Sequence, residues 1–390
     1  MDKDITGKSI FSNKRVIAFI VFAVLLTVYA FPQGLISRYY GVNISFDKLI
    51  FSAIVIGAFV ANKLFTMRIS KAQLLFVAFA IIFSILCKDP RCLLFCYLPA
   101  LEDLLPFKDK IMRVLKKTGI LYICLAFTVF YTILYAGLGI VNQDRFAFSA
   151  IGEINQSGLA IFCLAVMLMI KNKKIGYTVM AFGLLTISRS YYLAVMLYGL
   201  SKVGFVKKLL SKIKHWWFFR YWFLTVVTSI LLVGIGFFFI QQNAIGNVYW
   251  GDDADTRLFQ LLDYSNLFRF VTNIALLMIF LRTPSALLTG LSDSAYFYES
   301  SVSYAELGIP FKTVNPHNLF FSHLRMYGLF ALAETWYIDR IMRKIVNEKT
   351  VMVFLIMVAY SVILGAGLYS YWIFLAVFAM ACESNLALEE

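Results

Sequence analysis

The sequence predicts an all-α, polytopic transmembrane helix bundle of about 12 spans that forms a single domain over residues 1–390. Composition is the first reason: 61% of the residues are hydrophobic and 15% are charged. A soluble domain is about half apolar and about a quarter charged, and the mean hydropathy here is +0.78. The second reason is that the charges cluster between long apolar runs. We therefore expect a lipid bilayer to cover most of the apolar surface.

Each spanning helix needs about 20 apolar residues. Twelve runs approach this length, and they begin near residues 16, 47, 72, 92, 119, 158, 175, 191, 221, 317, 351 and 370. The run from 92 to 105 is the weakest because it is short and contains Pro99. No small-residue cleavage site follows the first run, so we expect a membrane span there rather than a cleaved signal peptide.

Basic residues indicate the orientation of the chain in the membrane. Most of the 36 Lys and Arg residues lie in the N-terminal segment and near 63–71, 108–117, 171–174, 202–220 and 340–349. Under the positive-inside rule these segments are cytoplasmic, which places the N- and C-termini in the cytoplasm. The net charge of +14 then reflects topology, and we expect no nucleic-acid partner. Basic and aromatic residues over 205–222 predict a helix on the anionic inner leaflet.

Residues 241–316 form the longest polar segment, and the same orientation makes them one large extracytoplasmic loop. The stretch 267–281 within it is apolar and is flanked by Arg269 and Arg282. We expect an interfacial or substrate-capping helix here, because a thirteenth span would break the charge pattern that follows.

Several function classes lack their motifs in this sequence. There is no P-loop, no dinucleotide-binding glycine motif, no HExxH and no GxSxG,. The six cysteines lie within or beside apolar runs without nearby histidines, so we expect small buried residues rather than a zinc site. Asp253 and Asp255 form an Asp-x-Asp that can hold a divalent metal, but a hydrated acidic turn is the commoner case. We therefore predict neither a metal nor a cofactor.

Arg189 is the most informative single residue. It lies between Ser188 and Ser190 in a polar break between two apolar runs. An arginine at the bilayer centre costs roughly 2.5–3.5 kcal/mol on insertion scales, so even one near a helix end needs a partner. That partner is either a lipid phosphate, reached by snorkelling, or an anionic substrate.

Other polar residues are expected on the same outer face as Arg189. They are Arg145, Glu153, Asn155, Arg257, Arg269, His317 and Asn318. Two of them have a plain structural alternative: Asn155 can cap a helix, and His317 can be a hydrogen-bonded interface residue. An enzyme on this face has no ATP, so its donor substrate must arrive activated and attached to a lipid.

Four segments carry a resemblance to a known family. They read TISRS (186–190), INQSGLA (154–160), TPSALLTGLSD (283–293) and NPHNLFFSHLRMYGL (315–329). In these segments, and in the long outer loop with spaced arginines, the chain resembles the O-antigen/capsular polysaccharide polymerase (Wzy-type) family of the O-antigen ligase–polymerase superfamily. The resemblance covers most of residues 119–345, although TGLSD lacks the fuller glycine-rich form common in the family.

The resemblance implies a metal-independent membrane glycosyltransferase with a GT-C-like fold in the bacterial cell (inner or plasma) membrane. Its substrates would be oligosaccharide repeats on undecaprenyl pyrophosphate, used in capsule, O-antigen or exopolysaccharide synthesis. The partners implied are the lipid bilayer, a flippase and chain-length regulator proteins. A lipid-linked oligosaccharide flippase or exporter and an O-antigen-type ligase remain the alternatives.

The expected catalytic roles follow from the charge of the pyrophosphate donor. Arg189 and Arg257 would stabilise the leaving pyrophosphate by bidentate hydrogen bonds, and Arg269 would be a weaker third. His317 would accept the proton of the acceptor hydroxyl, with Glu153 as the competing base. The remaining substrate-binding candidates are Arg145, Asn155 and Asn318.

Overall fold

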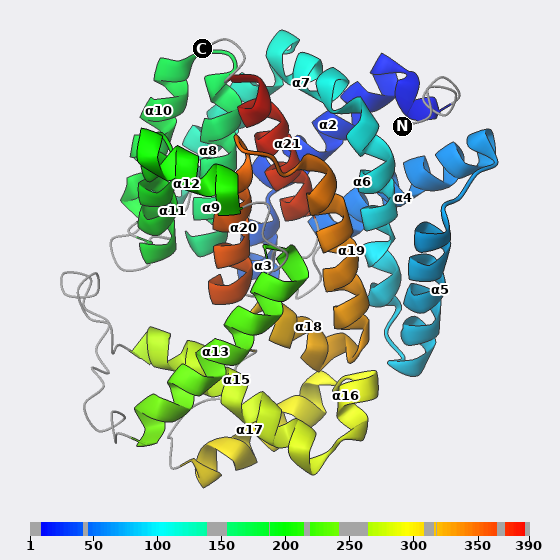
Figure 1. Ribbon diagram of the computed structural model, residues 1–390, viewed down its shortest axis with the longest axis vertical. Coiled ribbons are helices and arrows are strands. Elements are labelled where there is room, and N and C mark those ends of the chain that lie inside the picture. The colour runs from blue at the N-terminus through cyan, green and yellow to red at the C-terminus, as the bar shows by residue number, and fades with distance from the viewer. Residues whose placement is uncertain are drawn as a thin grey trace.

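A computed structural model describes residues 9–41, 46–138, 154–186, 188–213, 219–241, 264–307, 316, 318–364 and 371–386. Every regular element in these ranges is a helix (Figure 1), which confirms the predicted all-α class. Of the six cysteines, all but Cys87 are buried.

The described helices range from three-residue 3-10 turns to helices of 21 residues. The first half contains η1 (Ile10–Ser12), α2 (Lys14–Tyr29), α3 (Gln33–Tyr40), α4 (Phe46–Thr66), α5 (Lys71–Leu86), η2 (Pro90–Cys96), α6 (Tyr97–Leu104), η3 (Leu105–Phe107), α7 (Lys108–Lys117), α8 (Ile120–Gly137), α9 (Ile154–Met169), α10 (Lys173–Phe182), η4 (Gly183–Thr186) and α11 (Arg189–Leu200). The second half contains α12 (Gly204–Ile213), α13 (Tyr221–Gln241), α15 (Tyr264–Arg282), α16 (Ser285–Thr289), α17 (Asp293–Glu306), α18 (Leu319–Tyr327), α19 (Phe330–Ile345), α20 (Val351–Leu364) and α21 (Tyr371–Leu386).

Polar side chains set where several helices begin. Ser70 and Gln73 form a reciprocal capping box at the start of α5, which satisfies two backbone N–H groups that have no partner within the helix. Asn13 caps α2 and Asn172 caps α10 in the simpler way, by accepting a hydrogen bond from the first turn,.

The centre of the bundle is formed by α9 and α21, which pack against each other. Residues 159–170 and 372–382 are buried on every side, as expected for helices that are apolar all round. Helices α4, α5, α8 and α13 lie further out and expose large apolar side chains, among them Phe65, Ile85, Ile133 and Phe238. Apolar surface of this extent is suited to contact with lipid.

Within the described ranges, three helices are long and apolar enough to cross a membrane: Phe46–Thr66, Ile120–Gly137 and Tyr221–Phe238. Shorter apolar helices cover Lys71–Leu86, Gln156–Met169, Phe270–Arg282, Val351–Val362 and Trp372–Ser384. The count of 12 spans stays a prediction.

Four predicted runs are not single spanning helices. The run from 92 is divided among η2, α6 and η3. The runs from 175 and 191 correspond to α10 and α11, of 10 and 12 residues, which extend only about 15 and 18 Å at 1.5 Å per residue. The run from 317 is broken at Gly328, where α18 ends and the chain turns into α19.

The helix expected near 267–281 exists as α15, which begins at Tyr264 and ends at Arg282. Residues 271–276 are buried, and α15 packs against α13 and α17. Its apolar side therefore faces other helices of the protein. The side chain of Arg269 lies outside the described part of the structure, and so do residues 242–263 and 308–315.

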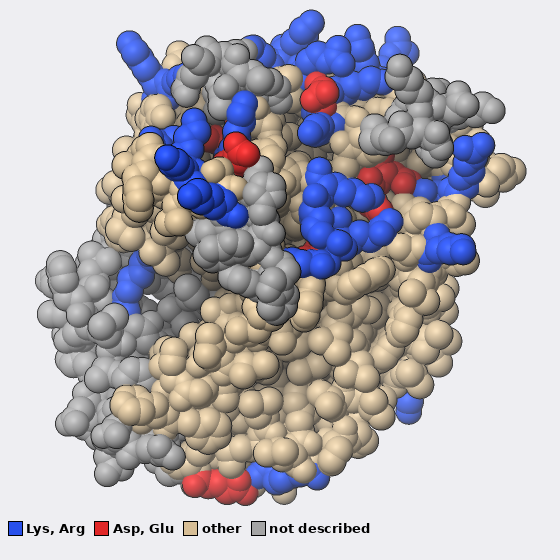
Figure 2. Space-filling view, viewed as in Figure 1, with Lys and Arg blue, Asp and Glu red and all other residues tan. Residues whose placement is uncertain are grey.

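Charge divides the molecule into two ends. Lys and Arg side chains gather over the upper part of the molecule (Figure 2), where α7, the start of α10 and the end of α19 lie. We call this the basic end. The lower part, with α15, α16 and α17, is mostly uncharged apart from a small mixed group. We call this the far end.

Candidate functional site

The polar break around Arg189 is confirmed in the structure. Helix α10 ends at Phe182, the 3-10 turn η4 follows, and Arg189 is the first residue of α11. Arg189 is half-buried, and its Nη1 atom is fully shielded from solvent. The chain thus interrupts two apolar helices at a point where it presents a partly buried guanidinium.

Two tyrosines of α11 hold this break in place. Tyr191 donates a hydrogen bond of 2.7 Å to the Met180 carbonyl, and Tyr192 donates one of 3.0 Å to the Leu184 carbonyl. A Cβ on Gly183 would lie 2.2 Å from the Tyr191 hydroxyl, so only glycine allows this contact. These bonds satisfy carbonyls that the helix ends leave without a helical partner.

Arg189 lies at the level where α9, α11 and α20 meet. A Cβ on Gly158 of α9 would be 3.4 Å from the Tyr191 side chain and 3.2 Å from the Tyr360 hydroxyl of α20. The close approach of three helices at a glycine fixes the position of the first turn of α11 relative to the bundle.

Asn318 lies beside the C-terminal end of α20, where it contacts the Val362 carbonyl. It is completely buried and caps α18 by accepting a hydrogen bond of 3.0 Å from Phe321 N. Its Nδ2 donates to Ser229 Oγ of α13 at 2.8 Å and to the Val362 carbonyl of α20 at 3.0 Å. Asn318 therefore joins α13, α18 and α20 with all its polar atoms, and the substrate-binding role predicted for it stays a prediction.

Two of the segments that carry the family resemblance meet through a pair of glycines. Gly290 has φ +75° and Gly328 has φ +55°. A Cβ on Gly290 would lie 2.5 Å from the Met326 carbonyl oxygen, and one on Gly328 would lie 2.2 Å from the Leu288 carbonyl oxygen. The two backbones therefore cross in direct contact, which non-glycine residues would prevent.

This crossing brings Arg325 to Asp293. Arg325 is buried, and its Nη1 lies 2.6 Å from Asp293 Oδ1, while the Asp293 side chain is 64% exposed. The guanidinium carbon also lies 4.6 Å from the centre of the Tyr296 ring, within range of a cation–π interaction. A buried arginine is thus held by one carboxylate that faces outward and one aromatic face.

A fully buried pair joins α18 to α19 close to Arg325 in the sequence. His323 Nδ1 is 2.5 Å from Glu334 Oε2, and both side chains are buried. Phe95 and Tyr327 pack edge-on against the imidazole ring. A hydrogen bond between an imidazole and a carboxylate is strong in such apolar surroundings because the local dielectric constant is low.

The other predicted site residues cannot be placed. His317, Arg257, Glu153, Arg145, Asp253 and Asp255 lie outside the described residues. Asn155 and Arg269 lie in α9 and α15, but their side chains are also outside that part of the structure. Of the residues predicted from sequence, the structure describes the side chains of Arg189, at the start of α11, and Asn318, which is bonded to α13 and α20.

Comparisons of the chain with family models, with curated proteins and with solved structures gave no match.

The described part of the site has a cation suited to an anionic ligand. Arg189 supplies a partly buried guanidinium, whereas the charge of Arg325 is paired with Asp293. Among the residues that the structure describes, no three His, Cys, Asp or Glu side chains gather as metal ligands. Arginine forks recognise phosphate oxygens by paired hydrogen bonds, which makes phosphate the matching ligand chemistry.

Sequence reasoning missed Arg325, Asp293, His323 and Glu334. The sequence analysis took the run that begins near residue 317 as one spanning helix. Gly328 was the signal that could have corrected it, because a glycine after an amphipathic stretch commonly ends a helix. With the helix ended there, α19 takes a new direction and Glu334 reaches His323.

Proposed function

We propose that this chain is a membrane-embedded glycosyltransferase that polymerises lipid-linked oligosaccharides. It transfers a growing glycan from undecaprenyl pyrophosphate to the non-reducing-end sugar of another lipid-linked repeat. The observation that carries the proposal is a partly buried cation in a polar break between apolar helices: Arg189 begins α11, which packs beside α9 and α20. The apolar exterior of α4, α8 and α13 supports a membrane location.

The reaction follows from the chemistry of the donor. The acceptor hydroxyl oxygen forms a bond to the anomeric carbon of the donor glycan, and the bond from that carbon to the pyrophosphate oxygen breaks. The leaving undecaprenyl pyrophosphate takes the electron pair, and the hydroxyl proton passes to a base. Negative charge grows on the leaving group, so a fixed guanidinium such as that of Arg189 lowers the barrier.

We assign the base to His317, with Glu153 as the alternative, and a second phosphate contact to Arg257. Arg325 is a positioning residue in this proposal. It is buried and paired with Asp293, so it acts on the site through the elements that it holds together. Asn318 stays a candidate for substrate binding.

The distribution of charge gives the proposed enzyme an orientation in the membrane. The basic end would face the cytoplasm, as the positive-inside rule requires, and Arg189 would face the opposite side of the membrane. We propose a bacterial cell membrane location on the same grounds, with lipid-linked repeats delivered to the outer side by a separate flippase.

Reconstitution tests the proposal. The purified protein is placed in liposomes with one defined undecaprenyl-pyrophosphate-linked repeat, and the glycans released from the lipid are sized. We expect a ladder of multiples of the repeat with the parent protein and single repeats with Arg189→Ala. Transbilayer movement of the repeat without lengthening would indicate a flippase, and transfer only to an unrelated acceptor would indicate a ligase; either result contradicts the polymerase proposal.

A further inference from the structure

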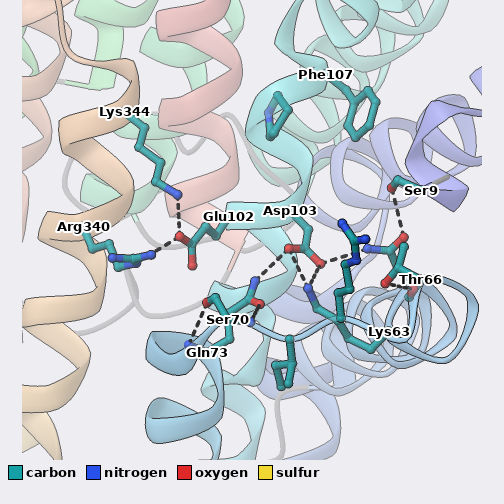
Figure 3. A pocket seen from close by; sticks show the side chains of 14 residues that line it. Ser9, Lys63, Thr66, Ser70, Gln73, Glu102, Asp103, Phe107, Arg340 and Lys344 are labelled. Atoms are coloured by element: carbon teal, nitrogen blue, oxygen red, sulfur yellow. Dashed lines mark hydrogen bonds and ion pairs between the residues drawn. The ribbon is translucent and has the colours of Figure 1, made fainter. Parts of the chain in front are cut away.

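A polar cavity of about 390 Å³ lies towards the basic end, between the α4–α5 turn, the end of α6 with η3, and α19. Figure 3 shows side chains from all these elements pointing into it. Its volume falls in the range of small-molecule sites. Nothing in the proposed transfer reaction uses this cavity, because Arg189 and Asn318 do not line it.

Two consecutive acidic residues at the end of α6 divide the cavity wall. Asp103 accepts hydrogen bonds from Asn62 Nδ2 at 2.9 Å and from Gln73 Nε2 at 2.7 Å, and it pairs with Lys63 at 2.7 Å. Glu102 points away from Asp103, towards α19 (Figure 3). Each carboxylate is therefore engaged by several donors, and neither is left as a ligand for a cation.

Glu102 is held by three side chains of α19. It pairs with Arg340 Nε at 2.9 Å and also contacts Lys344 Nζ and the Tyr337 hydroxyl. Burial alone would raise the pKa of Glu102, but the hydrogen bonds from Lys344 and Tyr337 and the charge of Arg340 outweigh it and keep the pKa below its ordinary value. The group is therefore ionised at neutral pH.

Positive charge is left over after these pairs are made. Four cations line the cavity, Lys63, Arg68, Arg340 and Lys344, against the two carboxylates. Arg340 uses only Nε toward Glu102, and its two Nη atoms make no hydrogen bond with any described residue. Arg68 is exposed and makes no ion pair within the described ranges. Planar guanidinium groups with uncommitted N–H donors are suited to phosphate oxygens.

Apolar side chains border the same rim on the outside. Leu64, Phe65 and Met67 are all exposed, Met67 to 84%. They are interspersed along the chain with the cavity-lining Lys63, Thr66 and Arg68. The turn therefore presents a cationic pocket on one side and an apolar surface on the other. Basic pockets next to the apolar surface of membrane helices bind anionic lipid headgroups.

We propose that this cavity binds the phosphate headgroup of an anionic membrane lipid, whose acyl chains lie along the exposed apolar face of α4 and α5. Arg68 and Arg340 contact the phosphate oxygens, and Lys344 contributes charge. The lipid joins the α4–α5 turn to α19. The inference rests on the membrane location of the chain and is independent of the proposed glycan transfer.

Lipid binding to the purified full-length protein in detergent tests the proposal. Native mass spectrometry gives the Kd for phosphatidylglycerol, for phosphatidylcholine and for soluble glycerol 3-phosphate. We expect one tight phosphatidylglycerol site, with binding of the other two probes at least about tenfold weaker. Arg68→Gln and Arg340→Gln should each weaken phosphatidylglycerol binding by about tenfold, since a charge-assisted hydrogen bond is lost.

The matched control is Lys174→Gln, which removes one positive charge at the start of α10, outside the cavity. It should leave the Kd unchanged. Because Arg68 makes no ion pair within the described residues, Arg68→Gln tests the site even if Arg340→Gln disturbs folding at Glu102. Equal binding of phosphatidylglycerol by Arg68→Gln and the parent protein overturns the proposal. Binding of phosphatidylcholine, or of glycerol 3-phosphate, as tight as that of phosphatidylglycerol also overturns it.

Discussion

Replacing Gly328 with alanine tests the glycine crossing that joins α18 to the turn before α17. Gly328 has φ +55° and ψ −140°, a conformation open essentially to glycine alone, where an L-residue costs about 1–3 kcal/mol,. The new Cβ would lie 2.2 Å from the Leu288 carbonyl oxygen and 2.5 Å from its carbon. Because both are backbone atoms, they cannot rotate away, and opening the crossing should add about 1–3 kcal/mol. We expect the free energy of unfolding to fall by about 2–6 kcal/mol.

Thermal unfolding of the purified protein in detergent, at one scan rate, measures the effect. Gly57→Ala is the matched control, because Gly57 lies within α4 and a Cβ there meets nothing within 4 Å. In a helix interior this exchange should stabilise by about 0.5–1 kcal/mol. Gly328→Ala should therefore lower the unfolding temperature, whereas Gly57→Ala should leave it the same or raise it.

The double variant Gly290→Ala/Gly328→Ala separates a shared crossing from two unrelated sites. Both glycines touch the backbone of the opposite segment, so the first substitution opens space that the second also needs. Their combined effect should fall short of the sum by about 0.5–3 kcal/mol. An unfolding temperature for Gly328→Ala equal to that of the parent protein, or full additivity in the double variant, would refute the reasoning.

Three further predictions concern charged groups. Asp293→Asn should destabilise the protein by about 1 kcal/mol, because the carboxylate that pairs with Arg325 is largely exposed,; in a double-variant cycle with Arg325→Gln, zero coupling would contradict the pair. Glu102→Gln should destabilise by about 1–3 kcal/mol at neutral pH. The pKa of Glu102 is lowered in the folded state, so the stabilisation by Glu102 is present above the ordinary glutamate pKa and is lost as the pH falls through the folded value. The unfolding temperatures of Glu102→Gln and the parent protein should therefore converge in acid, and a difference that stays constant with pH would argue against this. Arg189→Lys keeps the charge but not the planar fork, so we expect polymer formation to slow by at least about tenfold in the liposome assay, and parent-like rates would remove Arg189 from the phosphate site.

Local sequence signals predicted the features that depend on neighbouring residues. The polar break at Arg189 follows from three polar residues between two apolar runs, and the structure confirms it. The helix near 267–281 follows from its apolar run, and α15 confirms it. Both depend only on residues within one or two helical turns, where patterning and propensity act directly.

Features that depend on distant residues were not predictable in this way. Glu102 is held by Arg340 and Lys344, more than two hundred positions later, and nothing in the local pattern of α6 indicates those partners. The Gly290–Gly328 contact likewise joins two turns that are separate in sequence. The burial of α15 was missed for the same reason, because an interfacial helix and one covered by protein have the same periodicity.

Helix length was the other source of error. Apolar runs near 175 and 191 satisfied the composition of a span, but α10 and α11 are short and are separated by a turn. Two tyrosines of α11 stabilise that turn by bonding back to α10 and η4. Hydropathy does not register such hydrogen bonds, so it merges short helices into longer ones or counts each as a full span.

The central claim is that the chain lengthens lipid-linked glycans on the side of the membrane opposite the basic end. The most direct measurement is made in cells of the native host that lack this gene, by sizing the lipid-linked glycan and testing its accessibility to a glycan-modifying enzyme added outside the membrane. The polymerase account predicts single repeat units that the external enzyme can reach, and restoration of long glycan by the parent gene. Single repeats that stay protected inside the cell, or long glycan that persists without the gene, would contradict it.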